Sequence, residues 1–180
     1  VDICVADSQG GIGYMIERMF RNVLIHHGIS KNVVCLVTQV VVDRNDPAFN
    51  DPQKRIGKIY SREEADNLSA KRGWIFSEEV KAEGGFRRVV PSPLPVDILN
   101  HDIIGDLARQ GNIVIAAGGG GVPVYIDEKN DVKPAEAVID KDRASSLLAS
   151  MIGAEEFYIL TDVPYIYINY KKPDQEIKEF

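Results

Sequence analysis

Apolar and polar residues alternate along the first part of the chain in blocks that predict a strand, a helix and a second strand. Residues 2–6 are a short apolar run that predicts a buried strand, and residues 12–27 carry apolar side chains at helical spacing, which predicts a helix that Gly28 ends. Residues 33–42 form a β-branched run, typical of a central strand covered on both faces.

The second half of the chain returns to this alternation. Strands that alternate with helices favour a parallel sheet covered by helices on both sides. The sequence therefore predicts an α/β fold, a three-layer α/β/α sandwich with a mainly parallel sheet. Its further elements are expected as helices over about 95–109 and 140–152 and strands over 112–117, 122–126 and 156–161, with residues 165–169 as a candidate partner of the last strand.

Residues 43–95 interrupt the regular alternation with turn-forming residues and irregular strands. Within them, SREEADNLSAKRG predicts a short helix, with Ser61 as its N-cap and Glu64 as the capping-box partner. A long excursion in an otherwise regular α/β chain is usually functional. We therefore expect a lid or a protruding subdomain over residues 43–95.

Composition and charge narrow the range of partners. The chain has 180 residues, 44% of them hydrophobic, and a formal net charge of −6, which favours one globular domain. Because Lys and Arg are scattered, neither nucleic acid nor a membrane surface is an expected partner. Cys4 and Cys35 lie in apolar runs without metal-ligand spacing, which favours free thiols in a reducing cytosol. Both chain ends fall within expected elements, so we expect the interior of a longer chain.

The residues that follow the expected strands are the first candidates for chemistry, because ligands of open α/β sheets bind beyond the carboxyl ends of the strands. Residues 7–11 follow the first strand, residues 118–121 follow the apolar run IVIAA, and residues 161–162 follow EFYIL. We expect these three stretches to share one rim of the sheet.

Four consecutive glycines, which we call the tetraglycine loop, indicate an anion site at this rim. Without Cβ atoms, successive backbone N–H groups can turn inward and hold phosphate oxygens. A flexible turn is the alternative interpretation. The four residues are Gly118, Gly119, Gly120 and Gly121.

The stretch EAVIDKD contains a lysine that could bind an anion at the tetraglycine loop. Lys141 is expected at the start of a helix, flanked by Asp140 and Asp142, which can orient a lysine or hold Mg²⁺. The alternative is a solvated helix N-terminus in which Asp140 is the cap.

The glycines of SQGGIGYMIERMF do not form a dinucleotide-binding fingerprint. Their spacing is not G-x-G-x-x-G, and IHHGISKNVVCL offers no acidic residue where the fingerprint needs one. A nicotinamide or flavin site is therefore not expected. These glycines more readily let an acceptor or a phosphate approach the helix, which makes Ser8, Gln9 and Gly10 candidate substrate-binding residues.

Seven stretches, taken together and in order, closely resemble the carbamate kinases of the amino acid kinase family. The resemblance covers nearly the whole chain, and FRRVVPSP with AVIDKD separates it from acetylglutamate, glutamate and uridylate kinases. The stretches are DSQGGIGYMI, DPAFNDPQKRIG, GWIFSEEV, FRRVVPSP, AAGGGGVPV, EAVIDKDRASSLLA and LTDVPYIYINYKKPDQ.

The resemblance implies reversible phosphoryl transfer between ATP and carbamate, giving ADP and carbamoyl phosphate, with Mg²⁺. It also implies a cytoplasmic homodimer that makes ATP in arginine breakdown. Residues 1–180 would then be part of one amino acid kinase domain, in which residues 43–95 cover the acceptor site and residues 96–180 begin the nucleotide-binding half.

The resemblance also assigns roles to residues. Lys54 matches the lysine that reaches carbamoyl phosphate, Lys141 the catalytic lysine that stabilises the transferring phosphoryl group, and Asp142 the aspartate that organises the lysines. The substrate-binding set adds Ser8, Gln9, Gly10 and the tetraglycine loop, and the nucleotide-binding set is Thr161, Asp162 and Val163, with Tyr167 and Tyr170 near the adenine.

The chain departs from the pattern of the carbamate kinases at three places. Arg55 stands where they have a proline, Pro164 where they have an acidic residue, and Lys171 where they have a glycine. Their N-terminal glycine-rich phosphate loop and their second catalytic lysine segment lie outside residues 1–180. Two alternatives therefore stay open: another amino acid kinase with a carboxylate or phosphate acceptor, and a non-catalytic nucleotide-binding relative.

Overall fold

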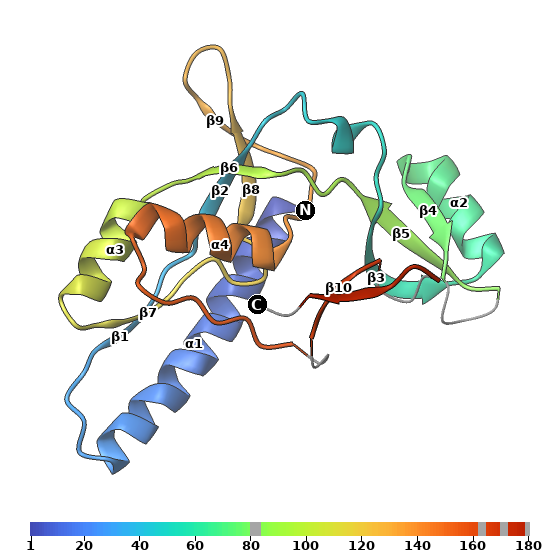
Figure 1. The fold of residues 1–180 in the computed structure, drawn as a ribbon. Coiled ribbons are helices and arrows are strands. Elements are labelled where there is room, and N and C mark those ends of the chain that lie inside the picture. Colours follow the sequence, from blue (N-terminus) through green and yellow to red (C-terminus); the bar gives the residue numbers. More distant parts are fainter. Residues whose placement is uncertain (80–83, 162–164, 170–172, 179–180) are drawn as a thin grey trace.

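The computed structural model describes residues 1–79, 84–161, 165–169 and 173–178, and Figure 1 shows their arrangement. The helical elements are α1 (Asp2–His26), η1 (Pro47–Phe49, a 3-10 turn), α2 (Arg62–Arg72), α3 (His101–Arg109) and α4 (Lys141–Ile152). The strands are β1 (Val33–Cys35), β2 (Gln39–Val42), β3 (Lys54–Tyr60), β4 (Ile75–Glu78), β5 (Phe86–Val90), β6 (Pro95–Ile98), β7 (Ile113–Ile115), β8 (Val122–Ile126), β9 (Val132–Pro134), β10 (Ile166–Ile168) and β11 (Glu176–Lys178).

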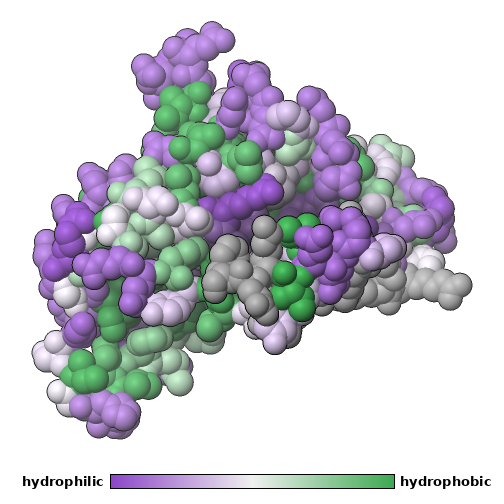
Figure 2. Space-filling model, viewed as in Figure 1, coloured by the Kyte–Doolittle hydropathy of each residue, from purple (hydrophilic) through white to green (hydrophobic). Residues whose placement is uncertain are grey.

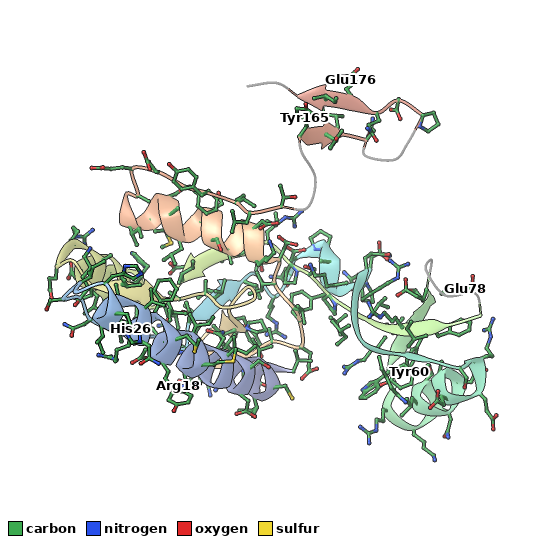
Figure 3. All side chains as sticks on the ribbon, turned by 90° about the horizontal axis from the view of Figure 1, so that it is seen from below. Arg18, His26, Tyr60, Glu78, Tyr165 and Glu176 are labelled. Carbon is green, nitrogen blue, oxygen red and sulfur yellow. The ribbon has the colours of Figure 1, made fainter. Side chains whose placement is uncertain are left out.

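The main body is built from helices on the two sides of short sheets. One sheet has the order β6-β2-β8-β9, and β1 pairs with β7 next to it. The β2–β8 and β1–β7 pairs are parallel, whereas β6 and β9 add antiparallel edges. Helix α1 packs against β1 and β8, while α3 packs on β7 and α4 on β6. Figure 3 shows α1 and α4 on opposite sides of the strands, which confirms the α/β fold class.

The hydrophobic core lies between the β6-β2-β8-β9 sheet and α4. Val40, Ile98, Ile139 and Ala144 are almost fully buried in it. Leu147, Leu148 and Met151 of α4 pack against this cluster, so the apolar face of α4 fixes the helix on the sheet. The N-terminus of α4, at Asp140, is thereby held in one place.

Residues 54–90 form a separate small unit beside this body, at the right of Figure 1. Its antiparallel sheet has the order β3-β5-β4, and α2 packs on β4 and β5. The expected capping box is confirmed, because the Ser61 side chain accepts from Glu64 N–H while the Glu64 carboxylate accepts from Ser61 N–H. Gly73, in the left-handed conformation, ends α2.

The prediction of a strand over residues 2–6 is wrong, because these residues are the first turns of α1. A short apolar run cannot distinguish a strand from a helix by its period alone. Gly10 and Gly11 do not end the helix either, since a glycine inside a helix costs only about 1 kcal/mol relative to alanine. Gly13 allows close packing, because a Cβ there would overlap the Cys35 sulfur.

Three other boundaries also differ from the prediction. Residues 33–42 are two strands in different sheets, and the backbone N–H of Thr38 between them donates to the Gln9 side chain. Residues 95–98 are the edge strand β6 and not helix, since proline is accepted at the start of an edge strand. Residues 156–161 form no strand, because among the described residues no strand edge pairs with them, and β10 pairs with β11 instead.

The predicted apolar face of α1 is only partly buried. Ile12, Met15, Met19, Phe20 and Val23 remain 47 to 54% exposed, although their spacing matches a core-facing stripe. Figure 2 shows hydrophobic residues gathered over the end of α1 at the lower left. Leu24 is the residue of this stripe that is buried.

Candidate functional site

A cavity of about 1060 Å³ lies between α1, the tetraglycine loop and the unit of residues 54–90. Each of these parts contributes lining residues from a distant place in the sequence. Because the walls come from all three, the fold itself assembles the site. The contributions that matter here are Ser8 and Gln9 from α1, Gly118, Gly119 and Gly121 from the loop, and Trp74 and Arg88 from the unit.

Packing explains three of the four glycines in the tetraglycine loop. A Cβ at Gly118 would lie 2.6 Å from Gln9 Cγ, one at Gly120 would overlap Ile139 O, and one at Gly121 would overlap the Val40 side chain. Gly120 also has a φ of +133°, which L residues rarely adopt. Gly119 differs, because a Cβ there would meet nothing within 4 Å. Gly119 is therefore the member of the loop with open space at the Cβ position, and it lines the cavity.

A buried amide holds the loop against α1. Gln9 Oε1 accepts a hydrogen bond from Thr38 N at 3.0 Å, and Gln9 Nε2 donates to Thr38 O at 3.3 Å. Thr38 Oγ1 in turn accepts from Ala117 N, at 2.8 Å, directly before the loop. Because unpaired buried polar groups are costly, this chain of bonds fixes the position of the loop.

Lys54 and Asp140 connect the unit of residues 54–90 to the start of α4. Lys54 Nζ donates to Asp140 Oδ2 at 3.0 Å, while Asp140 Oδ1 accepts from the backbone N–H groups of Asp142 and Arg143. Partial burial raises the pKa of Asp140, but the Lys54 hydrogen bond and charge together with the two N–H groups outweigh this and hold the pKa below its ordinary value. The cap that the alternative interpretation of EAVIDKD gave to Asp140 is therefore present.

Lys141 follows Asp140 and pairs with Asp142. This hydrogen bond and the nearby carboxylate charges raise the pKa of Lys141 above its ordinary value. Both side chains are about half exposed, and neither Lys54 nor Lys141 lines the cavity. The tetraglycine loop lies next to the two residues that precede Lys141, because Gly120 packs directly against the backbone of residues 139–140.

Of the other predicted site residues, some line the cavity and others do not. Ser8 and Gln9 line the cavity from within α1, not from a loop after a strand as expected, and Ser8 Oγ donates to Cys4 O. Gly10 is exposed on α1 and does not line the cavity. Thr161 is exposed after α4.

Tyr167 lies in the β10–β11 hairpin with its ring edge-on to that of Tyr165. Figure 3 shows this hairpin apart from the unit that carries Tyr60 and Glu78. The structure therefore does not place the hairpin beside the cavity. The remaining predicted nucleotide residues Asp162, Val163 and Tyr170, and the departures Pro164 and Lys171, lie outside the described residues.

Two cavity residues were not among the predicted site residues. The Arg88 guanidinium lies 4.1 Å from the centre of the Trp74 ring and 3.8 Å from Glu136 Oε2. The adjacent arginines Arg87 and Arg88 are a weak sequence signal for this site, since neighbouring residues of a strand point to opposite faces. Arg87 instead pairs with Glu79 at 3.4 Å.

In the described part of the chain, no group of three or more His, Cys, Asp or Glu side chains is placed to hold a metal ion. Within the same residues, no helix has the length and apolar character needed to cross a membrane.

A glycine loop that follows a parallel strand pair in an α/β fold and packs against the start of a helix is the type of backbone arrangement that binds phosphate groups in many proteins. The chain belongs to the amino acid kinase family, whose sequence profile matches residues 14–180. The expected family membership is thus confirmed.

Similar proteins carry the name carbamate kinase. That of Staphylococcus epidermidis is 46% identical over 173 residues, which are 96% of this chain and 55% of that protein. That of Thermococcus kodakarensis is 48% identical over 176 residues, 98% of this chain and 55% of that protein. The structure of the Giardia lamblia carbamate kinase bound to AMP-PNP superposes with a TM-score of 0.82 at 42% identity, and covers 98% of this chain and 55% of that one. The expected resemblance to carbamate kinases is confirmed, and the chain spans about half the length of these relatives.

Proposed function

We propose that this chain forms part of a carbamate kinase, which transfers a phosphoryl group reversibly between ATP and carbamate. In the ATP-forming direction, the bond between phosphorus and the carbamate oxygen of carbamoyl phosphate breaks, and a bond to a terminal oxygen of ADP forms. The observation that carries the proposal is the tetraglycine loop, packed against the backbone of residues 139–140, where Asp140 accepts from Lys54 and is followed by the Lys141–Asp142 pair. The similarity to named carbamate kinases along almost the whole chain supports it.

The proposed roles follow from charge and position. Phosphoryl transfer needs positioned reactants and stabilised negative charge more than a covalent nucleophile. The backbone N–H groups around Gly119 and the Lys141 ammonium would stabilise the transferring group, and Asp142 would orient Lys141. Lys54 would bind the acceptor side, on carbamoyl phosphate.

The unit of residues 54–90 is proposed as the lid over this acceptor site. It forms one wall of the cavity through Trp74 and Arg88. Carbamate and carbamoyl phosphate decompose in water, so a wall that excludes solvent protects the reactants.

ATP or ADP is the proposed second substrate, and Mg²⁺ is proposed to arrive with its phosphates, because Mg²⁺ in such sites is held mainly by phosphates and one or two carboxylates. The Giardia lamblia relative was crystallised with AMP-PNP, which supports the nucleotide. Thr161, Asp162, Val163, Tyr167 and Tyr170 stay the proposed nucleotide residues. A cytoplasmic homodimer and a place in arginine breakdown are proposed from the resemblance alone.

An amino acid kinase with another carboxylate or phosphate acceptor is the second candidate. The family membership alone is compatible with it. The FRRVVPSP stretch, which builds β5 and brings Arg88 to the cavity, argues against it, because this stretch resembles the carbamate kinases and not the other amino acid kinases.

A coupled assay on the full chain as the cell makes it tests the proposal. We expect ATP formation from ADP and carbamoyl phosphate, and none from ADP with acetylglutamyl phosphate, glutamyl phosphate or UDP. ATP formation with one of those donors would identify the second candidate. Binding of ADP without transfer from any of them would indicate a non-catalytic relative.

A further inference from the structure

Asp140 uses its two carboxylate oxygens for two different purposes. Oδ1 accepts from the N–H groups of Asp142 and Arg143, at 3.0 and 3.4 Å, and so caps α4. Oδ2 accepts from Lys54 Nζ, at 3.0 Å. Capping requires only one oxygen, so it does not account for the contact with Lys54.

Stability does not account for this contact either. The side chains of Lys54 and Asp140 are 39% and 33% exposed, and ion pairs of that exposure contribute little to folding. The pair joins two parts of the molecule that are 86 positions apart in the sequence. The ion pair can instead set the position of the Lys54 ammonium group relative to α4 and the tetraglycine loop.

The residues around Asp140 suggest why the position of the Lys54 ammonium group is important. Asp140 is held at the N-terminus of a packed helix, and Gly120 packs against the backbone of residues 139–140. An ammonium group has three N–H donors, so Lys54 keeps two for another acceptor after it binds Asp140. A lysine side chain is otherwise flexible, and ordering it beforehand reduces the entropy lost when an anion binds.

We propose that Asp140 is a positioning residue, which holds Lys54 beside the tetraglycine loop so that its remaining donors bind the phosphorylated acceptor. This inference rests on the proposed function. Asp140 acts through Lys54 and does not touch the substrate itself. Its loss should therefore weaken the use of carbamoyl phosphate more than it slows the turnover of bound substrate.

The test is Asp140→Asn in the full chain as the cell makes it, assayed for ATP formation from ADP and carbamoyl phosphate. Asparagine still caps a helix but lacks the charge. We expect KM for carbamoyl phosphate to rise about tenfold, the scale of one charge-assisted hydrogen bond. We also expect kcat, KM for ADP and the melting temperature to change little.

Asp127→Asn is the matched control. Asp127 also accepts from two backbone N–H groups, of Lys129 and Asp131, and lies 3.6 Å from a lysine, Lys133. It stands in the β8–β9 turn, which Figure 1 shows projecting away from α4. We expect its kinetics to equal those of the wild type.

A double-mutant cycle with Lys54→Met tests whether Asp140 acts through Lys54. In the Lys54→Met background, Asp140→Asn should cause no further rise in KM for carbamoyl phosphate, because the partner through which it acts is gone. Equal rises in both backgrounds, an unchanged KM in Asp140→Asn, or a loss confined to melting temperature would each overturn the inference. A wild type that makes no ATP from carbamoyl phosphate would instead overturn the proposed function.

Discussion

At the residue scale, the tetraglycine loop shows that one sequence feature can have two physical causes. Gly118, Gly120 and Gly121 are required by neighbours that leave no room for a Cβ, whereas Gly119 faces open space. The sequence alone predicted the loop as an anion site but could not separate these two groups. The atoms that fill the space belong to residues far along the chain, such as Gln9 and Ile139.

This difference gives a paired prediction. Gly120→Ala should lower the free energy of unfolding by about 3 kcal/mol, because it adds backbone strain and an overlap with Ile139 O. Gly119→Ala should change it by less than about 0.5 kcal/mol, while KM for carbamoyl phosphate rises because the methyl group occupies the space where we propose that the anion binds. Urea unfolding and steady-state kinetics measure the two effects. A stable Gly120→Ala, or an unchanged KM in Gly119→Ala, would contradict this division.

At the scale of elements, the features that depend on nearby residues were predictable from the sequence, and those that depend on distant contacts were not. The capping box of α2 and the Asp140 cap of α4 depend on residues three or fewer positions apart, so the sequence predicted both helices correctly. The first turns of α1 and the strand β6 were predicted wrongly, because their type depends on which distant segments pack against them. The Lys54–Asp140 contact has no sequence signal at all, since 86 positions separate the two residues.

The two ends of the excursion predicted over residues 43–95 are joined by Asp46. Its Oδ1 accepts from Ala48 N at 2.8 Å and its Oδ2 from Leu94 N at 3.0 Å. The Leu94 and then the Ala48 hydrogen bond hold the pKa of Asp46 below its ordinary value. A carboxyl group whose pKa is lowered by folding stabilises the fold above its unfolded pKa, and this contribution is lost as the pH falls through the lowered value.

We therefore expect Asp46→Ala to lower the free energy of unfolding by about 1 kcal/mol at neutral pH, the usual effect of a lost cap. The difference from the wild type should shrink as the pH falls below the ordinary pKa of an aspartate. Urea titrations at several pH values measure it. Asp51→Ala is the control, because the Asp51 carboxylate accepts from the exposed Gln53 side chain two positions away and joins no distant segments among the described residues. A difference that stays constant down to acid pH would show that the carboxylate charge is not involved.

At the scale of the whole molecule, the fold brings three distant parts of the chain to one cavity. Helix α1, the tetraglycine loop and the unit of residues 54–90 each line it, and the start of α4 lies behind the loop. The α/β class and the family were predictable because many motifs occur in the right order. The wall formed by Trp74 and Arg88 was not predictable, since it depends on how that unit sits against the body.

The kinetics of Lys141→Ala test the central claim, that a lysine beside the tetraglycine loop stabilises the phosphoryl group in transfer. We predict a kcat for ATP formation about 10² to 10³ times lower than in the wild type, as for the loss of one group that stabilises transition-state charge. ADP binding and the melting temperature should be retained, and Lys129→Ala in the β8–β9 turn should behave as the wild type. A Lys141→Ala variant with full kcat would contradict the account.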